Sequence, residues 1–307
     1  MRIFLTGASG YIGGAVALRL IRDGATIHGL VRDAAKAEAV AALGIVPVLG
    51  SLDDYALLRS EAIAADATIN TASSDHRSAV ETLIGALENS GKPFLHSSGS
   101  SVVGDDARGE PSAHIHNDNE PLVTTPTRAG RAAIDRLVLG ATGVRSVVLC
   151  NTMVYGNVMA MPGESVLLAA LARPALVSGQ VRYAGRGLNR WSNVEISDVA
   201  DLYALALDKA PAASFLFVES GEEDMRSIAG AVAQRLGLGE TAGTTEEEAE
   251  ALWGPASHPL GMNSRVRGHR ARQLGWRPKH SSIIDWVTSP SSELCAPPGI
   301  ARQVGGS

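Results

Sequence analysis

Three glycines stand at regular spacing in the run TGASGYIGG near the start of the chain. Gly7, Gly10 and Gly13 follow the apolar segment Arg2–Thr6 and open a segment with helical periodicity, Tyr11–Asp23. Glycines here permit a tight turn, close approach of the backbone to a pyrophosphate, and close packing of helix on strand. Free N–H groups at the helix start attract phosphate, whereas an ordinary glycine turn is the alternative. The pattern predicts a dinucleotide-binding loop made by Gly7, Ser9, Gly10, Tyr11, Ile12 and Gly13.

The residue after the second predicted strand indicates which dinucleotide this loop would hold. Arg32 follows the strand Ala25–Val31, where an NAD site usually has an acid that accepts from the ribose 2′-hydroxyl. A guanidinium at this point can form a fork with the 2′-phosphate of NADP. Asp33 is expected to cap the next helix. Arg32 could also be a solvated surface arginine, but the pattern favours NADPH over NADH.

Strands and helices that alternate along the first half of the chain would position these residues. Strands are expected at Arg2–Thr6, Ala25–Val31, Ile45–Leu49, Ala67–Thr71, Pro93–Ser97 and Val144–Cys150. Helices are expected at Tyr11–Asp23, Asp33–Leu43, Asp53–Ala62, Asp75–Asn89 and Thr127–Gly140. The alternation predicts an α/β fold with a doubly wound parallel sheet, the Rossmann arrangement. Ser51 and Leu52 would then lie near the adenine, and Thr71 and Ala72 would line the cofactor cleft.

The second half of the chain has a weaker pattern. Helices are expected at Glu164–Ala172, Ser197–Lys209, Met225–Leu236 and Glu246–Trp253, with a strand at Phe215–Val218. The segment 296–307 is short and rich in proline and glycine, and we expect it to be flexible.

Composition excludes several classes of protein. Of the 307 residues 45% are hydrophobic and 19% charged, which is typical of a soluble globular protein with a sizeable core. The net charge of −5, without a Lys/Arg-rich run, argues against nucleic acid or an anionic membrane as partner. No stretch approaches the roughly 20 apolar residues of a membrane helix, and no signal peptide is expected. Cys150 and Cys295 cannot build a disulfide framework or a cysteine zinc site, so we expect a cytoplasmic protein.

Further segments accompany the glycine loop: FLHSSGSSVVG at 94–104, MVYG at 153–156 and RWSNVEISDVADLYALAL at 190–207. With them the chain resembles the extended short-chain dehydrogenase/reductase superfamily, or NAD-dependent epimerase/dehydratase family. VRDAAKAEAV, GSLDD, LGMNSRVRGHRARQLGWRP and the segment Asp75–Arg77 resemble an atypical, NADP-binding subgroup.

The resemblance implies two domains with a small-molecule substrate between them. The Rossmann domain would comprise residues 1–151 and about 191–213, and a smaller C-terminal α/β substrate domain about 152–190 and 214–290. By analogy, the helices starting near Asp75 and Thr127 would form a homodimer interface.

The superfamily's catalytic Tyr-x-x-x-Lys pair does not occur in the sequence. In TPTRAGRAAIDRL the resemblance places Thr127 at the tyrosine position and Arg131 at the lysine position, on one helix face. Arg131 could keep the positive charge and the ribose contacts of the lysine. Thr127 cannot replace the tyrosine, because an aliphatic hydroxyl is far less acidic than a phenol with a pKa of about 10.

Other positions of the catalytic pattern also differ. Gly99 stands where the superfamily has its oxygen-orienting Ser or Thr, and Ser98 and Ser100 flank it. Either serine could be presented by a small shift of the loop, or both could only close turns. Asp75 falls at the usual Asn position, either as a catalytic group or as a helix cap. Tyr155 lies beyond the sixth strand, either as an alternative acid or as a packing residue.

Some candidates are expected to have structural roles or border the pocket. His114 and His116 lack a third ligand at convincing spacing, so no metal site is expected. Arg190 and Trp191 are expected to pair and pack at the domain junction. The resemblance also places three residues beside the substrate pocket, namely Trp253, His258 and Asn263.

Together these patterns predict an NADPH-dependent oxidoreductase that reduces a small carbonyl compound or activated double bond. Arg131 would hold the ribose, and Ser98 or Ser100 would polarise the substrate oxygen. Tyr155, Asp75 or water would supply the proton. The alternatives are an NADP-binding sensor or regulator without catalysis, and a sugar-type epimerase or dehydratase, which the missing tyrosine disfavours.

Overall fold

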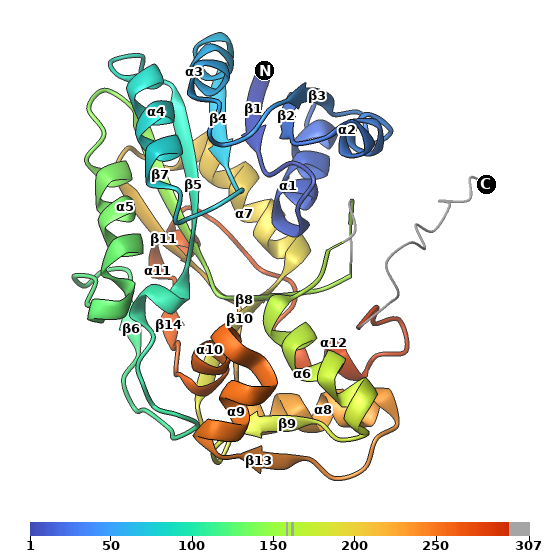
Figure 1. The fold of residues 1–307 in the computed structure, drawn as a ribbon. Helices are drawn as coiled ribbons and strands as arrows, with labels where there is room; N and C mark the ends of the chain where they lie inside the picture. Colours follow the sequence, from blue (N-terminus) through green and yellow to red (C-terminus); the bar gives the residue numbers. More distant parts are fainter. Residues whose placement is uncertain (158, 161–162, 295–307) are drawn as a thin grey trace.

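The computed structural model describes residues 1–157, 159–160 and 163–294, which form a large and a smaller lobe (Figure 1). Seven parallel strands form the main sheet in the order β11-β7-β5-β4-β1-β2-β3. They are β1 (Arg2–Thr6), β2 (Thr26–Val31), β3 (Val46–Leu49), β4 (Ala67–Asn70), β5 (Pro93–Gly99), β7 (Arg145–Asn151) and β11 (Ser214–Val218). The strand order reverses between β1 and β4, so the predicted doubly wound Rossmann fold is confirmed.

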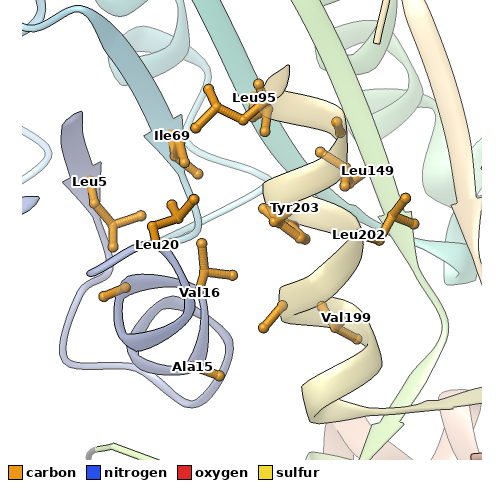
Figure 2. Close-up of a cluster of buried hydrophobic side chains, with 14 of the residues drawn as sticks. Leu5, Ala15, Val16, Leu20, Ile69, Leu95, Leu149, Val199, Leu202 and Tyr203 are labelled. Atoms are coloured by element: carbon orange, nitrogen blue, oxygen red, sulfur yellow. The ribbon is translucent and has the colours of Figure 1, made fainter. Parts of the chain in front are cut away.

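Helices cover both faces of the sheet, because each helix has one apolar side. Those on one face are α1 (Tyr11–Arg22), α2 (Ala34–Ala41) and α7 (Ile196–Lys209). Those on the other are α3 (Tyr55–Ala64), α4 (Arg77–Leu87) and α5 (Ala129–Leu139). In Figure 2, Val16 and Leu20 of α1 lie on the side of the sheet residues Leu5 and Ile69, whereas Leu202 of α7 lies near Leu149. Each such buried side chain contributes about 1.5–3 kcal/mol, which holds the strand ends in place.

Capping residues decide where the helices begin. Asp33 caps α2 as predicted, since its Oδ1 accepts from Lys36 N at 2.9 Å. The helix expected from Asp75 begins at Arg77, because the His76 side chain accepts from Ala79 N. The helix expected from Thr127 begins at Ala129, after the 3₁₀ turn η2 (Pro126–Arg128). Asp75 is therefore not the cap of α4, and Thr127 does not lie on α5.

The smaller lobe lies beyond the carboxyl ends of the sheet strands (Figure 1). Its paired strands are β8 (Met153–Tyr155), β10 (Arg190–Glu195) and β12 (Gly221–Asp224), β9 (Arg182–Ala184) with β13 (Ala242–Thr244), and β6 (His116–Asn117) with β14 (Val266–Arg267). Its helices and turns include α6 (Val166–Ser178), α8 (Met225–Leu236), η3 (Gly254–Ala256), α9 (Glu246–Trp253), α10 (Ser257–Gly261) and α12 (Ile283–Thr288). Buried side chains of these helices and of β8 form a separate core.

The chain returns to the large lobe twice after residue 191, through α7 and again through β11. All five residues of β11 are buried, and the strand pairs with β7 in the main sheet. α11 (His269–Gln273) follows, and Ala271 and Trp276 join the core beneath α1 and α7. The sequence placed a domain boundary near residue 213, which would assign β11 to the substrate domain. The structure does not support this boundary, because β11 pairs with β7 in the main sheet. The remaining domain limits stay predictions.

Two further predictions concern membrane contact and the tail. Within the described residues, no helix combines the length and the apolar character that a bilayer crossing requires. Cys150 is fully buried in β7 with a free thiol. Cys295 and the segment 296–307 lie outside the described residues.

Candidate active site

The glycine loop forms a tight cradle at the carboxyl end of β1. Gly7 has a φ of +79°, a left-handed conformation that favours glycine. A Cβ atom on Gly13 would lie 2.1 Å from the Gly7 carbonyl oxygen, and one on Gly7 would lie 2.8 Å from Ala72 N. Gly10 begins α1 without a side-chain cap among the described residues, and the first turn of the helix contains no acid. The cradle and the uncapped N–H groups fit a pyrophosphate.

The Tyr11 side chain ties this cradle to the smaller lobe. Its hydroxyl donates to the Gly156 carbonyl oxygen at 2.7 Å, and burial raises the pKa of the phenol. Ile12 packs against the core beneath α1, and Ser9 is half-buried. Tyr11 is therefore a structural bridge through its side chain, and only its backbone faces the predicted phosphate position.

Arg32 lies exposed just beyond β2, beside the cradle. Among the described residues its guanidinium has no hydrogen bond or ion pair, whereas Asp33 is engaged by Lys36. Ser51 Oγ accepts from Asp53 N at 3.2 Å, and Leu52 is half-buried against the core. A free guanidinium at this strand end fits a 2′-phosphate.

A row of buried, hydrogen-bonded polar side chains, which the sequence analysis did not identify, runs across three neighbouring strands. The register places Thr6, Asn70 and His96 side by side on β1, β4 and β5. Thr6 Oγ1 donates to Asn70 Oδ1 at 2.5 Å, and Asn70 Nδ2 donates to His96 Nδ1 at 3.0 Å. Burial lowers the pKa of His96 to about 4, so the imidazole is neutral and can accept. The signal in the sequence was a polar residue at the end of β1 and of β4 and in the middle of β5.

Thr71 directly follows β4, and its hydroxyl connects this row of polar side chains to the end of β1, where the glycine loop begins. Thr71 Oγ1 donates to the Thr6 carbonyl oxygen at 2.8 Å. Ala72 N donates to Asn70 Oδ1 at 3.4 Å and remains exposed at the cleft. Both residues therefore border the glycine loop at the carboxyl end of the sheet, as expected for a cofactor cleft.

Arg131 is the centre of the second half of the site. Its Nε and Nη2 donate to the two carboxylate oxygens of Asp75 at 2.9 and 2.5 Å. Its Nη1 donates to Ser101 Oγ at 2.9 Å. A Cβ atom on Gly99 would lie 3.1 Å from the same Nη1. Gly99 stands where the superfamily has a Ser or Thr hydroxyl. Because it has no side chain, it leaves room for the Arg131 guanidinium, which is held between Asp75 and Ser101.

The electrostatics of this group exclude Asp75 as a proton donor. The hydrogen bonds from Arg131 hold the pKa of Asp75 below its ordinary value. Arginine remains protonated in proteins. The pair is thus an ion pair across the neutral pH range, which can stabilise negative charge but cannot release a proton.

The structure does not bring Ser98 and Ser100 to Arg131. Ser98 Oγ donates to Asp135 Oδ2 of α5 at 2.8 Å, and Ser100 Oγ lies 2.7 Å from Ser264 Oγ. Both serines are buried, because alternation along β5 turns Ser98 toward the α5 core and the 3₁₀ turn η1 (Ser100–Val103) turns Ser100 inward. The sequence reading missed Ser101, the next residue, which contacts Arg131.

Within the described residues, neither the Tyr155 hydroxyl nor the Thr127 hydroxyl is hydrogen-bonded to Arg131, although Thr127 lines the same hollow as Arg131. Tyr155 is fully buried in the core of the smaller lobe, with its ring 5.8 Å from that of Trp286. Burial raises the pKa of its hydroxyl, which has no hydrogen-bond partner within the described part of the chain. Thr127 is exposed, and its hydroxyl lies 3.1 Å from that of Thr125. The geometry is that of a packing tyrosine and a surface threonine.

Several other candidates stabilise the smaller lobe and the loop that follows η1. Arg190 pairs with Glu222 at 2.9 Å, and Trp191 Nε1 donates to the Pro259 carbonyl oxygen. Asn263 Nδ2 donates to Asp105 Oδ2, which fixes the loop after η1. The same loop leads to β6, and the ring of His114, before this strand, contacts that of His116 within it. Asp118, directly after β6, accepts from His269 N. Trp253 is buried against α6, to which it donates a hydrogen bond.

One cluster has ligand atoms close enough for a metal ion, but its oxygens are engaged. Glu195, Asp198 and His280 offer atoms within 4.8 Å of one another. The two oxygens of Asp198 accept from the backbone N–H groups of Lys279 and His280, and Glu195 caps α7. These hydrogen bonds give the cluster a structural role, because they fix the start of α7 to the backbone of Lys279 and His280.

Comparison with known proteins agrees with this architecture. The sequence model of the NAD dependent epimerase/dehydratase family matches residues 3–215. An oxidase, ucsJ, from an Acremonium species is 30% identical over 92% of this chain and 94% of its own length. The Stigmatella aurantiaca 4-hydroxy-2-methyl-3-oxo-4-farnesyl-3,4-dihydroquinoline-1-oxide ketoreductase is 26% identical over 72% of this chain and 69% of its own.

A solved structure shares the fold over nearly the whole chain. The dTDP-glucose 4,6-dehydratase DesIV of Streptomyces venezuelae, with NAD and TYD bound, superposes with a TM-score of 0.74 at 20% identity. The alignment covers 94% of this chain and 95% of that one. With the glycine cradle, the sheet order and the family match in agreement, the chain belongs to the NAD-dependent epimerase/dehydratase family of extended short-chain dehydrogenases/reductases.

Proposed function

We propose that this protein is an NADPH-dependent oxidoreductase that reduces a small carbonyl compound or activated double bond. The observation that carries the proposal is the guanidinium of Arg131, held over Gly99 by Asp75 and Ser101. The oxidase and the ketoreductase among the relatives support redox chemistry. NADPH, when bound, would supply the hydride.

The cofactor would lie along the carboxyl ends of β1, β2 and β4. Gly7, Gly10 and Gly13 would cradle the pyrophosphate at the start of α1. Arg32 would form charged hydrogen bonds with the 2′-phosphate, which favours NADPH over NADH. Thr71 and Ala72 would line the cleft at the end of β4.

Arg131 would hold both ribose and substrate. Three of the five N–H donors of a guanidinium are used by Asp75 and Ser101, so two remain for a ribose hydroxyl and a substrate oxygen. Because Ser101 Oγ accepts from Arg131, its own proton is free to point toward the substrate oxygen. Together they would stabilise the negative charge that develops on that oxygen.

Water would deliver the proton in this arrangement. Asp75 is held as a carboxylate, Arg131 does not titrate, and Tyr155 is enclosed in the core. The open hollow beside Asp75 and Arg131 has a volume of about 400 Å³, which admits solvent.

A paired substitution tests the catalytic part of the proposal. NADPH consumption is followed by absorbance across a panel of aldehydes, ketones and enones. Ser101→Ala should lower kcat/KM by about a hundredfold, the effect of removing one oxyanion donor. Ser98→Ala is the matched control, because its hydroxyl bonds to Asp135 and should not affect turnover by the folded protein. Dependence on Ser98 and not on Ser101 would overturn this assignment.

A sensor or regulator without catalysis is the second candidate. It is favoured by the absence of a phenol beside Arg131 within the described residues, since the tyrosine position holds an exposed threonine. Tight NADPH binding without turnover of any compound in the panel would support this candidate over the oxidoreductase.

The cofactor preference has its own test. Arg32→Ala removes charged hydrogen bonds to the 2′-phosphate that we place at about 1.5–3 kcal/mol, or roughly ten- to a hundredfold in affinity. NADPH binding, followed by fluorescence, should weaken by that factor while NADH binding stays unchanged. Equal losses for the two nucleotides would contradict the role of Arg32.

A further inference from the structure

Arg128, one turn before Arg131, is a half-buried cation with few polar contacts in the described part of the chain. Its Nη2 donates to His258 Nδ1 of α10 at 3.3 Å, which joins the two lobes. Its Nε is buried and has no hydrogen-bond partner in the described part of the chain. Within the same residues no carboxylate lies at ion-pair distance from it. A cation shielded from water without a counter-charge is costly, so such an arrangement points to a ligand.

The neighbouring charges do not compensate Arg128. Asp75 is shared with Arg131 through two hydrogen bonds, and Arg77 is paired with Glu81. Burial, followed by the charge of Arg131, lowers the pKa of Arg128, and the charge of Asp75 opposes this shift only in part. Two guanidinium groups thus face one carboxylate, which leaves a surplus of one positive charge.

Each partner of the Arg128–His258 contact lines a hollow. Arg128 lines the open hollow of about 400 Å³ that also contains Asp75, Thr127 and Arg131. His258 lines a hollow of about 120 Å³ in the smaller lobe, together with Asp106 and Met262. A molecule bound in the larger hollow can therefore contact both Arg128 and Arg131.

We propose that Arg128, oriented by His258, binds a carboxylate group of the substrate, so that the substrate is a small carbonyl compound carrying one carboxylate. This inference rests on the proposed function and deepens it. A monoanion matches the single surplus positive charge, and the planar guanidinium matches the two oxygens of a carboxylate. His258 uses one of the N–H donors, so the remaining Nη donors are available. Binding there orients the carbonyl group toward Ser101 and Arg131.

Binding of benzoate and benzamide to the NADP⁺-loaded protein, measured by calorimetry, tests the site without turnover. The two probes share shape and differ in charge. Benzoate should bind about tenfold more tightly than benzamide, as expected for a charge-assisted hydrogen-bonded pair. Arg128→Gln should abolish this preference while benzamide and NADP⁺ bind as before. Arg128→Lys should retain part of it, because the charge remains but the fork is lost.

Arg136→Gln is the matched control, since Arg136 is exposed on α5, about two helical turns beyond Arg128. It should leave the preference unchanged. Equal binding of benzoate and benzamide, or a preference that survives Arg128→Gln, would overturn the carboxylate site. Failure of the proposed function would appear separately, as lack of NADPH consumption with terephthalaldehydic acid and its methyl ester while the preference for benzoate persists.

Discussion

We expect Asp135→Asn to change how the stability of the protein depends on pH, because Asp135 and His96 are buried together under α5. Asp135 is 1% exposed, accepts from Ser98 through Oδ2, and has its Oδ1 3.9 Å from His96 Nε2. Burial raises the pKa of Asp135 from 3.8 to about 6 and lowers that of His96 from 6.5 to about 4. Each shift corresponds to about 3 kcal/mol of unfolding free energy.

The two groups act in opposite directions. Between about pH 4 and 6 the folded state holds a proton on Asp135 that the unfolded state has lost, so this contribution to stability falls as pH rises. Between about pH 4 and 6.5 the unfolded state protonates His96 before the folded state does, so this contribution rises with pH. The two slopes nearly cancel in the native protein.

Asparagine at position 135 keeps the shape and the hydrogen bond to Ser98 but removes the titration. The variant should be more stable than the native protein by about 3 kcal/mol near pH 8, and this advantage should vanish near pH 4. The measurement is urea unfolding followed by tryptophan fluorescence across this pH range. Asp208→Asn, an exposed position on α7, is the control and should give a curve parallel to the native one. A constant difference between Asp135→Asn and the native protein across this range would refute the reasoning.

Two glycine substitutions test the site itself. Gly99→Ala places a methyl group 3.1 Å from Arg131 Nη1. It should lower kcat/KM by about tenfold with little change in Tm, because it weakens one charged hydrogen bond. Unchanged activity would contradict the steric role of Gly99. Gly13→Ala places a methyl group 2.1 Å from the Gly7 carbonyl oxygen, so it should cost about 1–3 kcal/mol of stability and abolish NADPH binding in a fluorescence titration. Gly85→Ala on α4 meets open space and should stabilise the protein slightly, whereas a similar loss of NADPH binding there would contradict this explanation.

The main sheet could be predicted because its strands are short apolar runs bounded by glycine or polar residues. β1 has the predicted bounds, and β3, which contains Pro47, lies at the sheet edge, where a proline is tolerated. The strands of the smaller lobe were missed because they are short or polar; β10, for example, reads RWSNVE. Such strands form because neighbours distant in sequence offer hydrogen bonds, which no local pattern records.

The active-site residues likewise include some that the sequence identified and others that depended on tertiary contacts. Arg131 and Asp75 were identified by resemblance and are in contact. Which of the hydroxyls of Ser98, Ser100 and Ser101 faces them depended on the end of β5 and the start of η1, where a change of one residue reverses the direction of the side chain. The structure selects Ser101, whereas Ser98 and Ser100 are buried.

The sequence by itself determined the dinucleotide cradle and the doubly wound sheet, because glycine spacing and apolar periodicity are local properties of the chain. Only the tertiary structure decided what surrounds the reacting position. Gly99 and Arg131 come together because α5 packs on β5, and Arg128 meets His258 across 130 residues of sequence. Contacts between lobes depend on how whole elements pack, so side-chain chemistry at the site became visible only after the chain was folded.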